Sequence, residues 1–204
     1  WVTNCLQSAT SVDVPAEVDG VTISGIQEGA FSQCFLLESL TLPDTITTIQ
    51  DSAFYGCSVL KKLEIPDSVT AMGKGTMEAC IALTDVKLPS TLDTLPTSTF
   101  YGCTALETVS FPEAMNTIGS EAFYQCTALK DVDLSQIATI ETYAFEGCSA
   151  LTDITIPETC TTLGDFVFDG CSALKEIQVA DSNPNYQDTV SYTHLRAHET
   201  SQDL

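Results

Sequence analysis

Cysteine is the residue in this chain whose type and spacing could do chemistry. Nine cysteines occur in 204 residues, and seven of them recur at intervals of 22 or 23: Cys34, Cys57, Cys80, Cys103, Cys126, Cys148 and Cys171. Structural zinc sites use ligand pairs that are roughly two to four residues apart. One cysteine per repeat instead predicts a column of reduced, buried thiols, because cysteine packs well as a small hydrophobe.

The two other cysteines are treated separately. Cys160 stands where other repeats have Ile, Val, Leu or Met, so we predict a core position. Cys5 lies outside the repeat, and it is expected to be a free thiol or to pair with sequence beyond this chain. The sequence leaves the redox state of both residues open.

Nucleophilic catalysis would need a general base beside a thiol or hydroxyl. The first 190 residues contain no His and no Arg; His194, Arg196 and His198 follow them in the string "HLRAH". Two histidines at i and i+4 can hold zinc on a helix, but no further ligand is evident nearby. We predict no catalytic residue, no metal ion and no cofactor.

The stretch "DSNPNY" resembles the start of a calcium-binding loop. Asp181, Asn183 and Asn185 match its first ligand spacings, but Tyr186 replaces the required Gly and Tyr192 replaces the final Glu. We reject the EF-hand interpretation and predict an Asn/Pro turn. Weak calcium binding elsewhere on the acidic surface stays an alternative.

The composition excludes two classes of partner. The formal net charge is −21, from 28 acidic and seven basic residues, and such a surface repels nucleic acids and anionic lipids. No apolar run is long enough to span a bilayer. The chain starts at "WVTNCLQSAT" without an initiator Met or a signal peptide, so we expect it to begin within a longer protein.

Several apolar columns recur together with the cysteines. A large apolar residue stands three positions before each repeated Cys: Phe31, Phe54, Met77, Phe100, Phe123, Phe145 and Phe168. A Leu stands three positions after each Cys, two more apolar positions follow in runs such as "LKKLEIP", and Pro often ends the run. The alternation predicts a strand, and stacking of the coils predicts a solenoid with a continuous core.

Two columns carry information about the backbone. The residue before Cys is Gly in four coils but Gln33, Ala79 or Gln125 in the others. We therefore expect no demand for positive φ there, and a short helical turn. A later column holds Gly in three coils but Pro96 in another, which predicts negative φ and a dispensable N–H. One coil is a residue short near Ser135, where we expect a tightened corner and an unbroken ladder.

The unit "AFYGCSVLKKLEIPDSVTAMG" resembles the BspA-like leucine-rich repeat family. The resemblance implies a leucine-rich-repeat solenoid that is right-handed, with a parallel β-strand ladder on the concave face and short helical turns and loops opposite. It also implies a secreted or cell-surface location. Several family members are adhesins, so host or neighbouring-cell proteins are the implied partners.

The resemblance suggests three segments. Residues 1–29 would form a partial N-terminal repeat. Residues 30–188 would hold seven leucine-rich repeats that start near 30, 53, 76, 99, 122, 144 and 167. Residues 189–204 differ in composition from the rest, and we interpret them as a non-native tail. The terminal coils lack obvious polar caps, so we expect fraying or aggregation of the isolated solenoid.

Two surfaces are candidates for ligand binding. The outward strand positions include Lys61, Lys62, Glu64 and Lys87 but no aromatic anchor, so a solvated face is the alternative. The residue after Phe is Tyr55, Tyr101 or Tyr124 in three coils, which predicts an exposed tyrosine edge; partial packing over the turns is the alternative.

The sequence favours one function over two alternatives. We predict a non-catalytic protein-protein or adhesion module of a larger surface or secreted protein. The alternative is an inert spacer with no specific ligand. An enzyme has almost no support, and the oligomeric state stays open.

Overall fold

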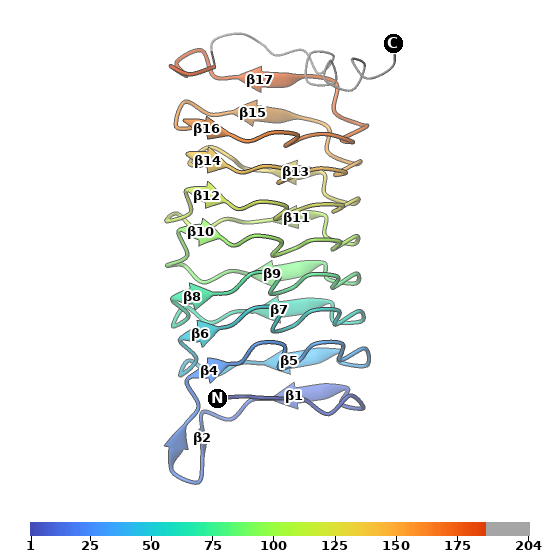
Figure 1. Cartoon of the computed structure of the whole chain (residues 1–204), viewed down its shortest axis with the longest axis vertical. Coiled ribbons are helices and arrows are strands. Elements are labelled where there is room, and N and C mark those ends of the chain that lie inside the picture. The colour runs from blue at the N-terminus through green and yellow to red at the C-terminus, as the bar shows by residue number, and fades with distance from the viewer. Residues whose placement is uncertain (187–204) are drawn as a thin grey trace.

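The computed structural model describes residues 1–186 as a solenoid of stacked coils (Figure 1). One ladder of strands, which we call the first ladder, comes from the predicted strand runs. Its strands are β1 (Ser11–Asp13), β5 (Ser39–Thr41), β7 (Lys62–Glu64), β9 (Asp85–Lys87), β11 (Thr108–Val109), β13 (Asp131–Val132), β15 (Ile154–Ile156) and β17 (Ile177–Val179). The predicted leucine-rich-repeat solenoid with parallel strands is confirmed.

A second ladder, which the sequence did not predict, comes from the last apolar pair of each coil. Its strands are β4 (Gly25–Ile26), β6 (Thr48–Ile49), β8 (Ala71–Met72), β10 (Thr94–Leu95), β12 (Thr117–Ile118), β14 (Thr139–Ile140) and β16 (Thr162–Leu163). Figure 1 shows these strands running opposite to those of the first ladder. The core lies between the two ladders and the turns that join them.

Parallel pairing places equivalent residues of neighbouring coils side by side. Leu63 lies beside Val86 in the first ladder, and Ile49 lies beside Met72 in the second. This register stacks each apolar column on itself, as the repeat predicts. The first ladder is hydrogen-bonded two strands at a time, whereas the second contains runs of three and four strands.

The short coil interrupts only one ladder. Thr139 pairs with both Thr117 and Thr162, so the second ladder, which the sequence did not predict, continues past the missing residue. The expectation of an unbroken ladder is wrong for the first ladder, where β13 and β15 are not paired, although unpaired neighbours also occur there where no residue is missing. At this corner the Ser135 N–H donates to Asp133 Oδ1 at 2.9 Å. Other coils have Pro in this column, which has no N–H to satisfy.

The Phe, Cys and Leu columns form one buried cluster. All of the Phe residues in the column, Met77 and the seven repeated cysteines are buried. Neighbouring rings contact one another, with centroids 5.3 Å apart for Phe100 and Phe123 and 5.1 Å for Phe123 and Phe145. Cys160 is also fully buried. A single coil would leave these rings in water, so the burial depends on stacking.

The expected short helical turns are matched only loosely, because the described residues contain turns but no helix. Each turn has successive i to i+3 bonds, such as Cys57 N to Phe54 O at 3.2 Å and Leu60 N to Cys57 O at 3.2 Å. Gly56, which lies inside the first of these turns, has φ of 70°. A left-handed residue ends any right-handed helix at that point.

The expectation that the residue before Cys does not need positive φ is wrong. Gln33, Ala79 and Gln125 have φ of 58°, 59° and 58°, in the same region as the glycines of the other coils. The N–H of this residue donates to the next coil, for example from Ala79 to Tyr101 O at 2.7 Å. These bonds between coils fix the left-handed conformation even where the side chain disfavours it.

A second left-handed column lies two residues before each Phe or Met. Its members are Gly29, Ser52, Gly75, Ser98, Glu121, Tyr143 and Phe166, with φ between 52° and 61°. Their N–H groups also donate to the next coil, as from Glu121 to Thr142 O at 3.1 Å. Each turn is therefore tied to its neighbour by backbone bonds of its own, outside both ladders.

The column that contains Pro96 has negative φ, as predicted, but its N–H is not dispensable. Gly73 N donates to Ile49 O at 2.8 Å, and Gly119 N donates to Leu95 O at 2.9 Å. Pro96 has no N–H to donate, and β8 and β10 are not paired. The proline thus coincides with the gap in the second ladder.

The N-terminal segment completes a further, irregular coil. Val2 bridges to Ile26 in parallel, and β1 pairs with β5. An antiparallel hairpin of β2 (Glu17–Val18) and β3 (Val21–Thr22) projects from this coil, below the other strands in Figure 1. Cys5, which the repeat pattern leaves out, is partly buried and packs against the core.

The predicted Asn/Pro turn closes the last described coil. Asn183 is fully buried; its Nδ2 donates to Pro157 O at 2.6 Å and Cys160 O at 3.1 Å. Its Oδ1 accepts from the N–H groups of Asn185 at 2.8 Å and Tyr186 at 2.9 Å. One amide side chain therefore satisfies four backbone groups. The predicted tail at 189–204 and His194, Arg196, His198 and Tyr192 lie outside the described residues.

Candidate protein-binding surfaces

The outward positions of the first ladder form an exposed polar face. Lys61, Lys62, Glu64 and Lys87 are all exposed on it. Lys62 Nζ lies between two carboxylates, 2.9 Å from Glu64 Oε1 and 3.4 Å from Asp85 Oδ2. The hydrogen bond to Glu64 and then that to Asp85 raise the pKa of Lys62. The Lys62 side chain therefore stays protonated, and the two carboxylates balance its positive charge.

Two other lysines of this face are also paired. Lys87 lies 3.4 Å from Asp67, and Lys130 lies 2.8 Å from Glu107. The backbone N–H of Ser90, and then Lys87, lower the pKa of the Asp67 carboxyl. Such exposed pairs contribute little to stability. They do keep this face closer to neutral than the acidic composition of the whole chain suggests.

Shallow grooves run between strands of the same face. One, of about 370 Å³, lies over β5 and β7 and is lined by Thr41, Lys62 and Glu64 among others. Another, of about 450 Å³, lies over β11 and β13 and includes Phe111 and Gln136. The groove over β11 and β13 exposes mainly polar surface, whereas the groove over β5 and β7 exposes more apolar than polar surface. Both are open, so they suit contact with a protein surface better than enclosure of a small molecule.

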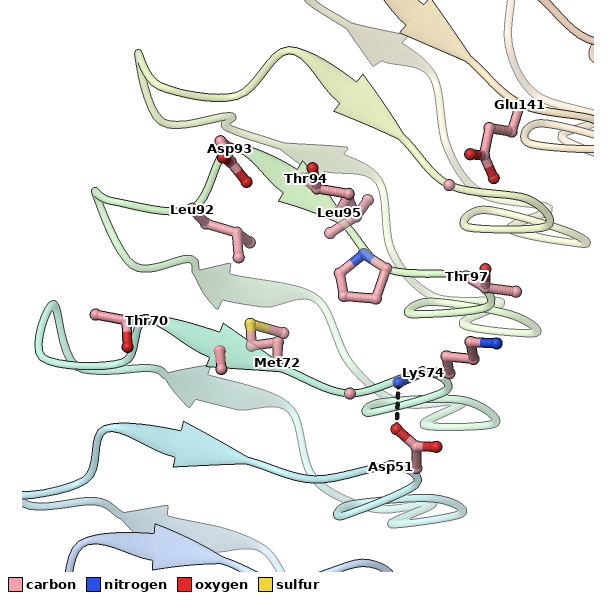
Figure 2. A pocket seen from close by; sticks show the side chains of 14 residues that line it. Asp51, Thr70, Met72, Lys74, Leu92, Asp93, Thr94, Leu95, Thr97 and Glu141 are labelled. Atoms are coloured by element: carbon pink, nitrogen blue, oxygen red, sulfur yellow. Dashed lines mark hydrogen bonds between the residues drawn. The ribbon is translucent and has the colours of Figure 1, made fainter.

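A third groove, of about 460 Å³, lies on the second ladder where β8 and β10 are unpaired (Figure 2). Figure 2 shows Asp51, Asp93 and Glu141 around it, with Lys74 beside Asp51. Asp51 Oδ1 accepts the Lys74 N–H at 2.9 Å, so this carboxylate supports the backbone. The groove contains hydroxyls and carboxylates but no nucleophile with a base beside it, so its geometry does not indicate catalysis.

The three tyrosines predicted at one edge of the solenoid do not form a continuous row. Tyr101 and Tyr124 are partly exposed and stacked, with ring centroids 4.6 Å apart and planes at 13°. Tyr55 is also partly exposed, but Glu78 occupies the coil between it and Tyr101. The structure therefore brings two of the three predicted tyrosines together.

A second aromatic pair was missed in the sequence. Tyr143 and Phe166 stack with centroids 5.4 Å apart, and Phe166 is 46% exposed. They belong to the left-handed column two residues before Phe, next to the column of Tyr124. The sequence does contain these two aromatic residues 23 positions apart, but only the geometry of the turns places both rings at the same edge of the solenoid.

The cysteine column has a role that hydrophobicity alone does not explain. Six of the seven thiols in the column donate to the backbone carbonyl of the Phe or Met in the preceding coil, as Cys103 Sγ does to Met77 O at 3.2 Å. The same bond occurs for Cys57, Cys80, Cys126, Cys148 and Cys171, at 3.1 to 3.2 Å. Burial raises the pKa of Cys34 to about 12 and raises the pKa of Cys103 well above 9.0. Neutral, enclosed thiols of this kind are poor nucleophiles.

Side chains that could hold a metal ion do not cluster within residues 1–186. No three His, Cys, Asp or Glu side chains there lie together as metal ligands would. The same part of the chain offers no helix with the length and apolarity to cross a bilayer.

Solved structures of bacterial leucine-rich repeat proteins share this fold. A protein from Eubacterium ventriosum is 30% identical over 81% of this chain, with a TM-score of 0.72; the chain covers 44% of it, less than half its length. The leucine-rich repeat protein of T. pallidum is 29% identical over 81% of this chain and 78% of its own, with a TM-score of 0.75. The pneumococcal vaccine antigen PcpA has the fold at 21% identity and a TM-score of 0.54, over 84% of this chain and 51% of its own.

No curated protein matches the chain. The family model for the BspA type leucine-rich repeat region matches in six copies, over residues 24–148 and 134–194. These ranges include the Phe, Cys and Leu columns and every strand of the two ladders except β1. Folds of this kind are generally repeat scaffolds that bind proteins or hold structure, rather than enzymes. The chain belongs to the BspA type leucine-rich repeat family.

Proposed function

We propose that this solenoid is a non-catalytic protein-binding module of a larger surface or secreted protein, and that the face of the first ladder contacts the partner. The observation that supports this most is the face itself. Its outward side chains are exposed and polar, and parallel pairing holds them in register over successive coils. A rigid array loses little conformational entropy when it binds.

An adhesive role is the finer part of the proposal. One structural neighbour, PcpA, is a pneumococcal vaccine antigen, and display at a bacterial surface would suit an antigen of this fold. Host matrix proteins or proteins of neighbouring cells are then the partners to test. Their recognition would depend on polar contacts and shallow grooves, because the face lacks large aromatic anchors.

The test is equilibrium binding to immobilised matrix proteins and intact neighbouring cells. Saturable binding that falls on triple charge reversal of Lys61, Lys62 and Lys87 to Glu would support the proposal. Lys74→Glu is the matched control, because Lys74 is exposed beside the groove of the second ladder (Figure 2). Binding that persists in the triple variant, or falls equally in the control, would contradict a role for the first-ladder face.

An inert spacer is the second candidate, and one observation favours it. Lys62, Lys87 and Lys130 are already paired with carboxylates of their own chain. A partner would have to compete with these pairs. If the intact protein binds neither matrix proteins nor cells, while its unfolding remains cooperative, the spacer explains the structure better.

A further inference from the structure

A mixed aromatic and acidic surface lies at the turns of the later coils, on the right-hand edge in Figure 1. We name it the aromatic edge and define it by seven residues: Tyr101, Glu121, Tyr124, Tyr143, Glu146, Phe166 and Asp169. All are partly or fully exposed. None of them belongs to the first-ladder face.

Two neighbouring columns build the aromatic edge. Glu121, Tyr143 and Phe166 are left-handed residues, with φ of 56°, 61° and 55°. Backbone bonds join the columns in each coil, as from Tyr124 N to Glu121 O at 3.0 Å and from Glu146 N to Tyr143 O at 3.1 Å. The aromatic rings change column between the coil of Tyr124 and the coil of Tyr143. Three of the four coils therefore place a ring next to a carboxylate, and the coil of Tyr101 has Ser98 in that position.

The rings are held in fixed positions. Tyr101 and Tyr124 stack at 4.6 Å, and Tyr143 and Phe166 stack at 5.4 Å. Tyr101, Tyr124 and Tyr143 are partly exposed and Phe166 is exposed, so a ligand can reach part of each ring. A cation over an exposed aromatic ring binds roughly twofold to fivefold more tightly, and more so when water is excluded.

The carboxylates of the edge repel one another. Partial burial, then Asp169, raises the pKa of Glu146, and Glu121 adds to the effect. The negative charge of Glu146 in turn raises the pKa of Tyr124. Partial burial and Glu121 raise the pKa of Glu78 in the adjoining part of the column. Negative charge is therefore concentrated here at a free-energy cost.

No ion pair relieves this charge within residues 1–186. The four ion pairs there join Lys62, Lys87 and Lys130 to carboxylates of the first ladder or the corner beside it. The Glu121 carboxylate accepts a hydrogen bond from the Ser98 hydroxyl at 3.2 Å and is in none of these ion pairs. The two surfaces thus differ: one neutralises its own charges, and the other presents them beside aromatic rings.

We propose that the aromatic edge binds an extended, Lys- or Arg-rich segment of a partner protein. Charge complementarity and the rings together select this occupant: guanidinium or ammonium groups would lie over Tyr101 and Tyr124 and pair with Glu121 and Glu146. Four coils at about 4.8 Å spacing cover roughly 15 Å, which about five extended residues span. The strong acidity of the chain would also steer a cationic segment towards it.

The experiment is a fluorescence anisotropy titration of the whole chain with a labelled ten-residue peptide that alternates Arg and Ser. We expect saturable binding at about 0.15 M salt. The Glu121→Gln/Glu146→Gln variant should raise Kd at least tenfold. The Tyr101→Leu/Tyr124→Leu variant should raise Kd about fivefold to thirtyfold, from the loss of two exposed cation–π contacts. Circular dichroism melting confirms that each variant is folded, and the carboxylate variant tests the proposal even if the tyrosine variant unfolds.

Asp153→Asn/Glu176→Gln is the matched control. It removes the same charge from exposed positions of the first-ladder face, and neither residue is in an ion pair. We expect less than a twofold change in Kd. An equal increase in Kd in both double variants would mean that the peptide binds by non-specific attraction to an acidic chain, which would overturn the proposal. A wild-type Kd above about 1 mM would also overturn it. This inference does not rest on the first-ladder face, because the charge reversals that test that face leave the aromatic edge unchanged.

Discussion

The Cys126 thiol donates a hydrogen bond to the Phe100 carbonyl of the preceding coil at 3.1 Å, while Cys103 N donates to the same carbonyl at 3.0 Å. One carbonyl thus joins a turn within its own coil to the side chain of the next coil. Alanine or valine could fill the column but could not make the second bond. The bond gives the repeat a physical reason to use cysteine.

Cys126→Ala should lower the free energy of unfolding by about 1–2 kcal/mol, from the lost S–H bond and a small cavity. Chemical denaturation followed by circular dichroism measures the change. Cys5→Ala is the control, because Cys5 is only partly buried, and it should change stability by less than about 0.5 kcal/mol. Equal effects of the two substitutions would show that the inter-coil bond contributes nothing.

Stability should fall as pH rises above 9. Burial raises the pKa of Cys103 and Cys126 above the ordinary 9.0, so these thiols stay neutral in the folded chain while the unfolded chain ionises them. The unfolded state then binds fewer protons, and each thiol removes up to about 1.4 kcal/mol per pH unit. Urea melts from pH 7.5 to 10.5 measure the slope. A Cys103→Ala/Cys126→Ala variant with the same slope would contradict this cause.

The left-handed column before Cys predicts two opposite effects of similar size. Ala79→Gly should stabilise the chain by up to about 1 kcal/mol, because glycine adopts φ near 59° without strain. Gly102→Ala should destabilise it by about 1 kcal/mol, through strain alone, since a Cβ there would lie 3.9 Å from its nearest neighbour. Thermal melting of both variants checks the signs; two changes of the same sign would refute the argument.

Pro96→Ala should restore a donor to the second ladder. In equivalent positions Gly73 and Gly119 donate to the preceding coil at 2.8 and 2.9 Å. We expect the new amide at position 96 to exchange at least about tenfold more slowly than an unprotected amide, which corresponds to about 1.4 kcal/mol of protection. Hydrogen exchange measured by NMR tests this, and fast exchange at position 96 would show that the gap between β8 and β10 has another cause.

Asn183 should control the order of the last described coil. Asn183→Ala would remove four hydrogen bonds and leave buried backbone groups unsatisfied, at a cost of about 2–4 kcal/mol. Asn183→Asp keeps the acceptor oxygen but loses the donor to Pro157 and Cys160, so its effect should be intermediate. Hydrogen exchange at Leu163, whose N–H donates to the Tyr186 hydroxyl at 3.0 Å, reports local opening. Unchanged exchange in the alanine variant would be inconsistent with this role.

Much of the fold was predictable because its signal repeats. Phe100, Cys103 and Leu106 belong to columns that recur every 22 or 23 residues, and only stacking can bury them all. The exposed positions around Lys62 followed from the alternation of the strand. Of the aromatic edge, only the tyrosines that follow Phe were predicted from the sequence, because Tyr143 lies in a different column from Tyr124.

The sequence by itself determined the solenoid, its core and its strand register, since a periodic apolar pattern can be buried in only one way. The tertiary structure decided the backbone between those columns. Ala79 and Gln125 adopt positive φ because their N–H groups reach carbonyls of the next coil, against their own preference. The same contacts between coils place Tyr143 beside Phe166 and turn the repeated Cys into a hydrogen-bond donor. Such choices depend on partners in the adjacent coil, and no local pattern of residues specifies them.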